Sequence, residues 1–108
     1  MQVKILDRVV ILNSLKPQAN MLEIAIQREI KKKVFIDEAT MIAVEWKQNG
    51  EQVNWNREKD VPVEIEFTKP ELLHMRAIFK DLDARGAITD EIYDTAILVG
   101  KDVPDPNP

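Results

Sequence analysis

Hydrophobic residues recur at helical spacing in the first third of this 108-residue chain. Residues 5–15 are open to two interpretations. The β-branched run Val9–Ile11 favours a strand, whereas apolar residues at positions 5, 9 and 12 favour a helix. We predict a helix for this segment, which ends where Pro17 breaks the chain.

A second helix is predicted over residues 20–33, where Asn20 can act as N-cap and Glu23 follows three residues later, as in a capping box. Its first half, MLEIAI, is apolar on nearly every side, and its second half, QREIKKK, is basic. We therefore expect the first half to enter a core or an interface and the second half to face water. The next segment, FIDEATM, is predicted to add one helical turn that Asp37 opens.

The pattern then changes to alternation on either side of Asn49–Gly50, which is a strong hairpin signal. With these two residues as the loop, the residue numbers of each cross-strand pair sum to 99. Trp46 then lies opposite Val53, and Val44 lies opposite Trp55. The apolar side chains share one face, and the opposite face is net acidic. We predict that both tryptophans are buried, and not exposed as the base-stacking platforms of a nucleic-acid-binding wing.

Two further helices are predicted after a strand at residues 63–67, which alternates apolar residues with glutamates. The first covers residues 69–84, with Thr68 and Glu71 as its capping box and Gly86 in the left-handed conformation that ends it. The second begins at Thr89 and runs to Gly100.

The predicted fold class is therefore α+β. A small three-stranded antiparallel meander, at about residues 42–47, 52–56 and 63–67, packs with two N-terminal and two C-terminal helices. Residues 1–100 are expected to form a single domain, and residues 101–108, which are rich in proline, a frayed tail.

Composition narrows the class of protein. Hydrophobic residues make up 44% and charged residues 31%, which is typical of a globular chain. There is no cysteine, which excludes disulfides and thiolate metal sites. Asp7 and Arg8 interrupt the apolar start that a signal peptide would need, and no apolar run approaches the roughly 20 residues that cross a bilayer. We expect a cytoplasmic protein without a membrane partner.

One long stretch resembles a known group of proteins. The string FIDEATMIAVEWKQNGEQVNWNREKDVPVEIEF, followed by a capped helix ending in LDARGAI and then by EIY, is similar to short proteins encoded by tailed phages and prophages. The likeness covers about residues 5–98. It implies a viral or prophage origin, a location in the bacterial host cytosol and a non-catalytic accessory role, and it assigns no functional residue.

The net charge of −4 is unevenly distributed. Residues 1–34 hold seven basic and three acidic residues, a net charge of +4, and the other 74 hold eight basic and sixteen acidic residues, a net charge of −8. The basic end of helix 20–33 is the best nucleic-acid signal in the chain, and it consists of Arg28, Lys31, Lys32 and Lys33. An alternative hypothesis is thus a winged-helix-like DNA-binding regulator. Its recognition helix would be IDEATM, which carries two acids, so nucleic acid is not the expected partner.

Three patterns approach catalytic or metal-binding chemistry. Residues 81–92 match a calcium loop at several positions, but Arg85 at position 5 and Ile92 at position 12 break the pattern. His74 is the only histidine, and no nucleophile or metal-ligand set accompanies it. Glu64 and Glu66 share one side of a strand, as paired catalytic carboxylates do, but are expected on its solvated face. We predict no enzymatic activity, no metal, no cofactor and no small-molecule substrate.

The expected function is protein–protein interaction, including self-association as a homodimer. Helix 20–33 carries more apolar surface than one face of a small domain needs, and residues 73 and 77 lie off the main apolar stripe of helix 69–84. A symmetric dimer would cover the same surface twice. The predicted interface residues are Met21, Leu22, Leu73 and Ala77.

Overall fold

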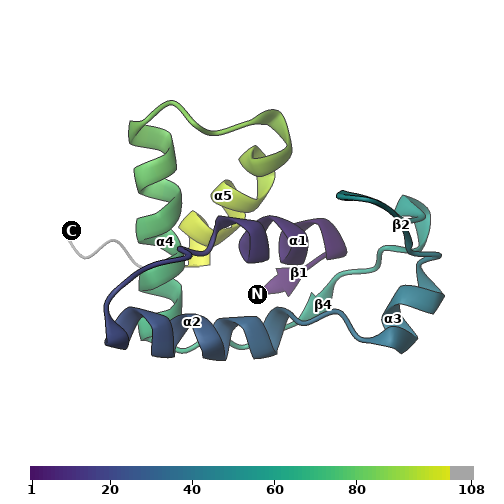
Figure 1. Cartoon of the computed structure of the whole chain (residues 1–108), viewed down its shortest axis with the longest axis horizontal. Coiled ribbons are helices and arrows are strands. Elements are labelled where there is room, and N and C mark those ends of the chain that lie inside the picture. Colours follow the sequence, from purple (N-terminus) through teal and green to yellow (C-terminus); the bar gives the residue numbers. More distant parts are fainter. Residues whose placement is uncertain (103–108) are drawn as a thin grey trace.

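The computed structural model describes residues 1–102, with side chains up to residue 100. Over this range the chain is an α+β fold with five α-helices and two small antiparallel sheets (Figure 1). The helices are α1 (Ile5–Ser14), α2 (Met21–Val34), α3 (Glu38–Ala43), α4 (Lys69–Ala84) and α5 (Asp90–Asp102). The strands are β1 (Gln2–Val3), β2 (Lys47–Asn49), β3 (Gln52–Asn54) and β4 (Val63–Glu64), and a 3₁₀ turn covers Arg57–Lys59. The predicted tail lies almost entirely outside the described residues.

The helical interpretation of residues 5–15 is confirmed, and tertiary contacts explain why a β-branched segment is helical. The carboxylate of Asp60 accepts a hydrogen bond of 2.7 Å from the backbone N–H of Ile5 at the start of α1. Asp7 accepts another of 2.9 Å from the backbone N–H of Lys4. These bonds satisfy donors that a helix N-terminus leaves unpaired. Val10 and Ile11 are both buried, and their packing stabilises the helix although β-branched residues have only a modest helix propensity.

The predicted caps of the other helices are also present. The side chains of Asn20 and Asp37 accept the N3 backbone N–H at the start of α2 and α3. Thr68 and Glu71 form the reciprocal capping box of α4. Gly86 follows α4 with a φ of +65°, the left-handed conformation that glycine adopts without a steric penalty.

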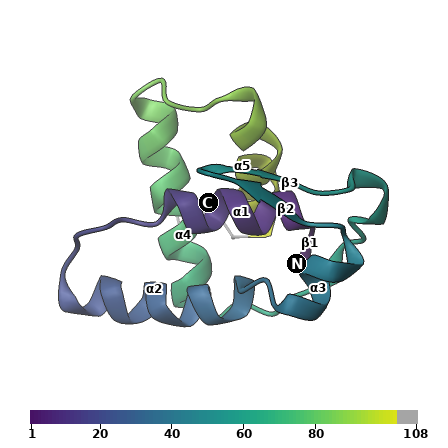
Figure 2. The same ribbon diagram turned by 45° about the vertical axis from the view of Figure 1, so that its right-hand side comes forward.

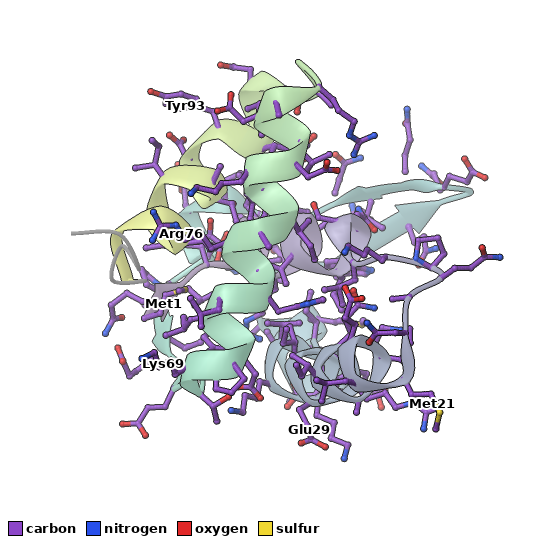
Figure 3. The ribbon with its side chains drawn as sticks, turned by 90° about the vertical axis from the view of Figure 1, so that its left-hand side faces the viewer. Met1, Met21, Glu29, Lys69, Arg76 and Tyr93 are labelled. Atoms are coloured by element: carbon purple, nitrogen blue, oxygen red, sulfur yellow. The ribbon has the colours of Figure 1, made fainter. Side chains whose placement is uncertain are left out.

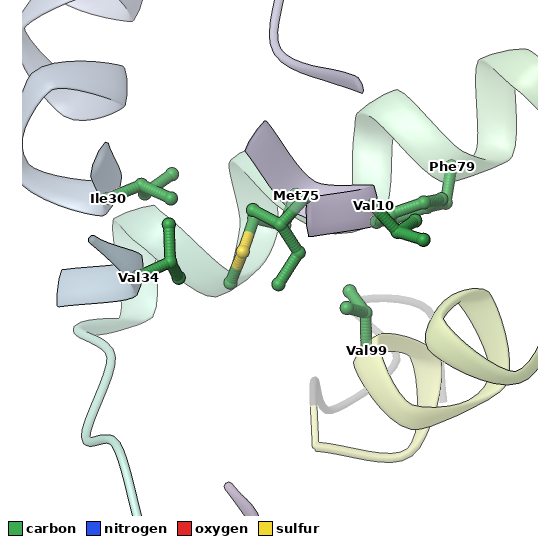
Figure 4. Packing of buried hydrophobic residues seen from close by; sticks show 7 residues of the cluster. Val10, Ile30, Val34, Met75, Phe79 and Val99 are labelled. Atoms are coloured by element: carbon green, nitrogen blue, oxygen red, sulfur yellow. The ribbon is translucent and has the colours of Figure 1, made fainter. Parts of the chain in front are cut away.

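The main core lies where α1, α2, α4 and α5 meet (Figure 4). It is built from apolar side chains of all four helices: Val10, Ile11, Ile30, Val34, Met75, Phe79 and Val99. In Figure 1, α2 runs along one edge of the molecule and α4 stands across it, with α1 packed inside the angle. The start of α1 also contributes to a second, smaller cluster.

This second cluster joins the hairpin and α3 to α1 (Figure 2). Its buried members are Ile5, Ile36, Val44 and Trp55. The hairpin of β2 and β3 is thereby attached to the helices through the side chains on one of its faces. The prediction that both tryptophans are buried is confirmed for Trp55, of which only 8% is exposed. It is wrong for Trp46, which is only partly buried at the edge of this cluster.

The predicted hairpin register is wrong by two residues. Asn49 pairs with Gln52, and Lys47 pairs with Asn54, so that partner numbers sum to 101 and the loop is Gly50–Glu51. Gly50 has a φ of +62°, and Glu51 does not share the positive φ that a type I′ turn would need. A glycine at the first loop position is typical of a type II′ turn, which leaves Asn49 in the strand. Because the shift is even, each side chain stays on its predicted face.

The predicted meander is not formed among the described residues. Strand β4 pairs with β1, a two-residue strand that the sequence pattern did not reveal, with Val3 opposite Val63. Strands β2 and β3 form a separate sheet. The predicted first strand, at 42–47, also starts too early, because α3 extends to Ala43 and Glu45 then takes a φ of +58°. This left-handed residue interrupts the ladder, and the backbone N–H of Trp46 donates to the carbonyl of Met41 at 2.8 Å.

Candidate interaction surfaces

The first candidate surface combines exposed apolar residues of α2 and α4; in Figure 3, α4 lies in the foreground and Met21 projects at the lower right. Met21 and Leu22, in the first turn of α2, are 91% and 71% exposed. On α4, Leu73 is 36% exposed and Ala77 is also exposed. We call these four residues the α2/α4 apolar face. All four were predicted as interface residues, and the structure leaves each of them accessible.

The apolar first half of α2 is exposed because only the second half is packed against the core. The buried residues of α2 are Gln27, Ile30 and Val34. In Figure 2, α2 begins beyond α4, and Met21 and Leu22 in its first turn are exposed. The expectation that the basic half faces water holds only for its outer side, because Lys33 is partly buried.

Two polar contacts attach α2 to α4. The Gln27 side chain, 2% exposed, accepts from the backbone N–H of Lys16 at 2.8 Å and donates to the Lys16 carbonyl at 2.9 Å. Its Oε1 also lies 3.0 Å from Nε2 of His74. Burial lowers the pKa of His74, which favours the neutral ring in this contact. His74 thus has a structural partner on α2.

The second contact involves Lys33 at the basic end of α2. Its Nζ donates to Oε1 of Glu71 and lies 5.8 Å from the centre of the Phe67 ring. Lys32 forms an exposed ion pair of 3.0 Å with Glu29. The four residues of the alternative DNA-binding hypothesis therefore differ in role. Lys33 joins α2 to α4, whereas Arg28 and Lys31 lie exposed on the outer side.

The tryptophans of the hairpin stack on each other within the second cluster. The rings of Trp46 and Trp55 are 5.6 Å apart between centroids, with an interplanar angle of 11°. The guanidinium carbon of Arg57 lies 4.0 Å from the centre of the Trp55 ring, and the indole N–H donates to Asp60 at 3.2 Å. Trp55 thus already has an aromatic and a cationic neighbour, and only 8% of it is exposed.

The carboxylates of the hairpin and of β4 have separate surroundings. Glu45 accepts from Asn56 at 2.9 Å and from Lys59 at 3.4 Å. The hydrogen bond from Asn56, followed by the charge of Lys59, lowers the pKa of Glu45. Glu64 accepts from the Gln2 side chain at 2.6 Å, and Glu66 is exposed.

The segment that matches a calcium loop is largely helical. Asp81 and Asp83 belong to α4, and Asp81 forms an ion pair of 3.0 Å with Arg85. Thr89 then caps α5 by accepting from the backbone N–H of Ile92 at 3.2 Å. This is a helix that ends at a glycine, followed by a second capped helix. In the part of the chain that the structure describes, no group of three or more His, Cys, Asp or Glu residues is placed to hold a metal ion.

Several buried polar residues were missed by the sequence reasoning. Asp7 accepts from the hydroxyl of Thr95 at 2.6 Å, which ties α1 to α5. Asp60 links the start of α1 to Trp55. The position of Asp7, three residues after Lys4, is the only sequence signal of these contacts, because it places an acid in the first turn of α1. Arg8 is 9% exposed, and its Nε has no hydrogen-bond partner among the described residues.

A second candidate surface is a half-open groove of about 320 Å³ between α4 and α5. Phe79, Ala96 and Val99 are among the apolar residues that line it, and Arg76 and Lys80 line it from α4. The sequence patterns gave no signal for this groove, because it depends on the spacing of two packed helices.

No known protein family, curated protein or solved structure matches this chain. No helix among the described residues combines the length and the apolar character needed to cross a membrane.

Proposed function

We propose that this protein is a non-catalytic interaction module, of the kind that phages and prophages use as accessory proteins, and that it binds a protein partner through the α2/α4 apolar face. The observation that carries the proposal is the exposure of Met21 and Leu22, at 91% and 71%, in adjacent positions of a capped helix. The phage or prophage assignment rests on the sequence resemblance alone.

Side-chain burial gives the scale of the binding energy. Covering a side chain such as Met or Leu contributes about 1.5 to 3 kcal/mol, so Met21 and Leu22 together would contribute about 3 to 6 kcal/mol. Association costs roughly 4 to 15 kcal/mol in lost translational and rotational freedom. The two residues are therefore not sufficient alone. The proposed partner therefore also contacts Leu73 and Ala77, which are exposed apolar residues of α4.

The internal use of the polar side chains supports a binding role over a catalytic one. Gln27, Glu71, Asp7, Asp60 and Thr95 are all buried, and each has a hydrogen-bond partner within the fold. An active site needs polar groups that point toward a substrate, in a cleft and with unequal environments. Four of these residues instead join one helix to another, and Asp60 joins the start of α1 to Trp55. An apolar face rimmed by polar residues is the feature that marks a protein-binding surface.

DNA binding through the basic end of α2 is the competing proposal. Arg28 and Lys31 are exposed and available to contact phosphates. Lys33 is engaged with Glu71, and Lys32 with Glu29, so the charge that this end presents is smaller than the sequence suggests. We place protein binding first for this reason.

Affinity capture with matched variants tests the proposal. The bait is the full chain, immobilised and exposed to lysate of a bacterium that carries the gene. Leu22→Glu with Leu73→Glu places two charges on the α2/α4 apolar face. Gln48→Glu with Gln52→Glu adds the same charges to exposed positions of the hairpin. We expect the wild type and the hairpin variant to retain the same protein, and the first variant to lose it.

Retention of the same proteins by both variants would contradict the proposal. Thermal melting of each variant checks that the fold is intact. All four substituted side chains are exposed, so each variant should keep the melting temperature of the wild type within a few degrees.

A further inference from the structure

Strand β4 has one edge along which no strand of the described chain pairs. Its sheet consists of β1 and β4, with Gln2 opposite Glu64 (Figure 1). The backbone N–H of Ile65 donates to the carbonyl of Met1 at 3.0 Å. Hydrogen-bonded and non-hydrogen-bonded pairs alternate along an antiparallel ladder, so Gln2 and Glu64 form a non-hydrogen-bonded pair. The backbone N–H and C=O of Glu64 therefore point away from β1, toward what we call the free edge of β4.

Two residues present backbone donors and acceptors along this edge. The hydrogen bonds between described residues use neither the N–H nor the carbonyl of Glu64, and neither that of Glu66 two positions further on. Pro62 has no N–H to donate, so the row of donors begins at Glu64. A row of unpaired backbone groups at the edge of a sheet is a template on which another strand can pair.

The side chains beside the free edge differ in character between its two faces. Val61 and Val63 are 70% and 40% exposed, although both are apolar. Glu64 and Glu66 are exposed on the opposite face of the strand, since successive side chains alternate. Glu66 forms no ion pair within the described part of the chain. The free edge thus offers apolar surface on one face and negative charge on the other.

We propose that the free edge of β4 receives an extended segment of another protein, which adds a third strand to this sheet. The segment accepts from the N–H of Glu64 and donates to its carbonyl, as in other cases of strand addition. Its apolar side chains cover Val61 and Val63, and its basic side chains lie opposite Glu64 and Glu66. The recognised sequence therefore alternates basic with apolar residues.

Charge argues against a second copy of this chain as the occupant. Two β4 strands paired about a two-fold axis would place Glu64 and Glu66 of one copy opposite the same carboxylates of the other. Like charges directly opposite each other destabilise a sheet, whereas opposite charges stabilise it. The free edge shares no residue with the α2/α4 apolar face, so this binding is separate from the proposed function.

Amide hydrogen exchange, followed by NMR on the full chain, tests the geometry of the free edge. In the chain alone, the amide of Ile65 should be protected, and the amides of Glu64 and Glu66 should exchange rapidly. The probe is a short synthetic peptide that alternates lysine with valine. At a free peptide concentration about ten times its Kd, exchange of the Glu64 amide should slow about tenfold. A peptide that alternates glutamate with valine should leave this exchange unchanged.

Two substitutions at one position separate the backbone contribution from the side-chain contribution. Glu64→Pro removes the N–H that faces the free edge, and proline is tolerated where a strand's N–H faces solvent. Glu64→Gln removes the same charge and keeps the N–H, so it is the matched control. We expect Glu64→Gln to raise the Kd of the lysine–valine peptide about two- to fivefold, by the loss of one cross-strand charge pair. Glu64→Pro should raise the Kd about tenfold further, because it also removes a backbone hydrogen bond.

Three outcomes would overturn the inference. The first is a Glu64 amide as protected as that of Ile65 in the chain alone. The second is no saturable binding of the lysine–valine peptide up to about 1 mM, or equal binding of both peptides. The third is the same Kd for Glu64→Pro and Glu64→Gln. If Glu64→Pro fails to fold, a lysine–valine peptide with N-methylated amides decides, because its binding with unchanged Kd would exclude strand pairing.

The two proposals can fail independently. The variant that carries Leu22→Glu and Leu73→Glu should bind the lysine–valine peptide with the Kd of the wild type, because neither substitution lies at the free edge. Loss of peptide binding in that variant would place the peptide on the α2/α4 apolar face and would contradict the assignment to β4.

Discussion

Replacement of Trp55 by alanine is the sharpest test of how the hairpin is attached to the helices. Trp55 is 8% exposed, lies in the second cluster with Ile5, Ile36 and Val44, and stacks on Trp46 at 5.6 Å. If it is a core residue, its truncation should destabilise the whole molecule. If it were a platform for bases, its truncation would leave stability nearly unchanged.

The expected loss of stability follows from the contacts that the Trp55 side chain makes. Truncation of a buried aromatic side chain to alanine costs about 3 to 5 kcal/mol. This range includes the stacked aromatic partner, worth about 0.5 to 1.5 kcal/mol, and the Arg57 contact, worth about 0.5 to 1 kcal/mol. Asp60 also loses the hydrogen bond that it accepts from the indole N–H. We expect a loss of about 4 kcal/mol from a total that is roughly 5 to 15 kcal/mol for domains of this size.

Chemical denaturation and thermal melting measure this loss. A change of about 4 kcal/mol should lower the Tm by roughly 15 to 30 °C in a chain of this length. Tryptophan emission of the wild type should be blue-shifted and poorly quenched by iodide. Gln52→Ala on the opposite, exposed side of the hairpin is the matched control, and it should change stability by less than about 0.5 kcal/mol. A Trp55→Ala loss below about 1 kcal/mol, together with red-shifted and freely quenched emission, would refute the reasoning.

Three further predictions concern the remaining candidate chemistry. Millimolar calcium should leave the Tm unchanged, because Ile92 replaces the bidentate carboxylate of a calcium loop; a rise of several degrees would show a site that binds the folded state. Burial opposes the ionisation of Glu71, but hydrogen bonds from Lys33 and the Thr68 backbone outweigh it and lower the pKa of Glu71 below its ordinary value near 4.5. The stabilisation that ionised Glu71 gives to the fold is therefore present above pH 4.5 and is lost as the pH falls through the lowered pKa. Glu71→Gln should flatten the dependence of unfolding free energy on pH in that acidic window. An unchanged dependence would argue against the ion pair of Glu71 with Lys33. On a DNA column the protein should elute at low salt, and Lys31→Glu should shift elution little; retention above about 200 mM salt that Lys31→Glu abolishes would favour the DNA-binding alternative.

Local signals predicted the helices and their ends well. Asn20, Asp37, Thr68 and Gly86 each act within a few residues of their own position, so the sequence near them contains the determining interaction. The faces of the hairpin were predictable for the same reason, since alternation has a period of two. The register was not, because it depends on whether the turn takes the conformation suited to Asn49–Gly50 or to Gly50–Glu51.

Long-range pairing could not be predicted in the same way. The strand at Val63 pairs with Val3, sixty residues away, and nothing in either short segment identifies its partner. The bond from Ile5 to Asp60 is similar, because Asp60 lies in a charged loop that is typical of solvent-exposed sequence. The exposed residues Met21, Leu22, Leu73 and Ala77 were predicted because helical periodicity alone shows which side chains a core stripe leaves out.

Photo-crosslinking in cells tests the central claim, that a protein covers the α2/α4 apolar face, most directly. A benzophenone amino acid at position 22, where the leucine is 71% exposed, is compared with the same amino acid at position 52, which is exposed on the hairpin. We predict a discrete crosslinked protein adduct from position 22 that Leu73→Glu removes, and none from position 52. Equal crosslinking from both positions, or none from position 22, would contradict the account.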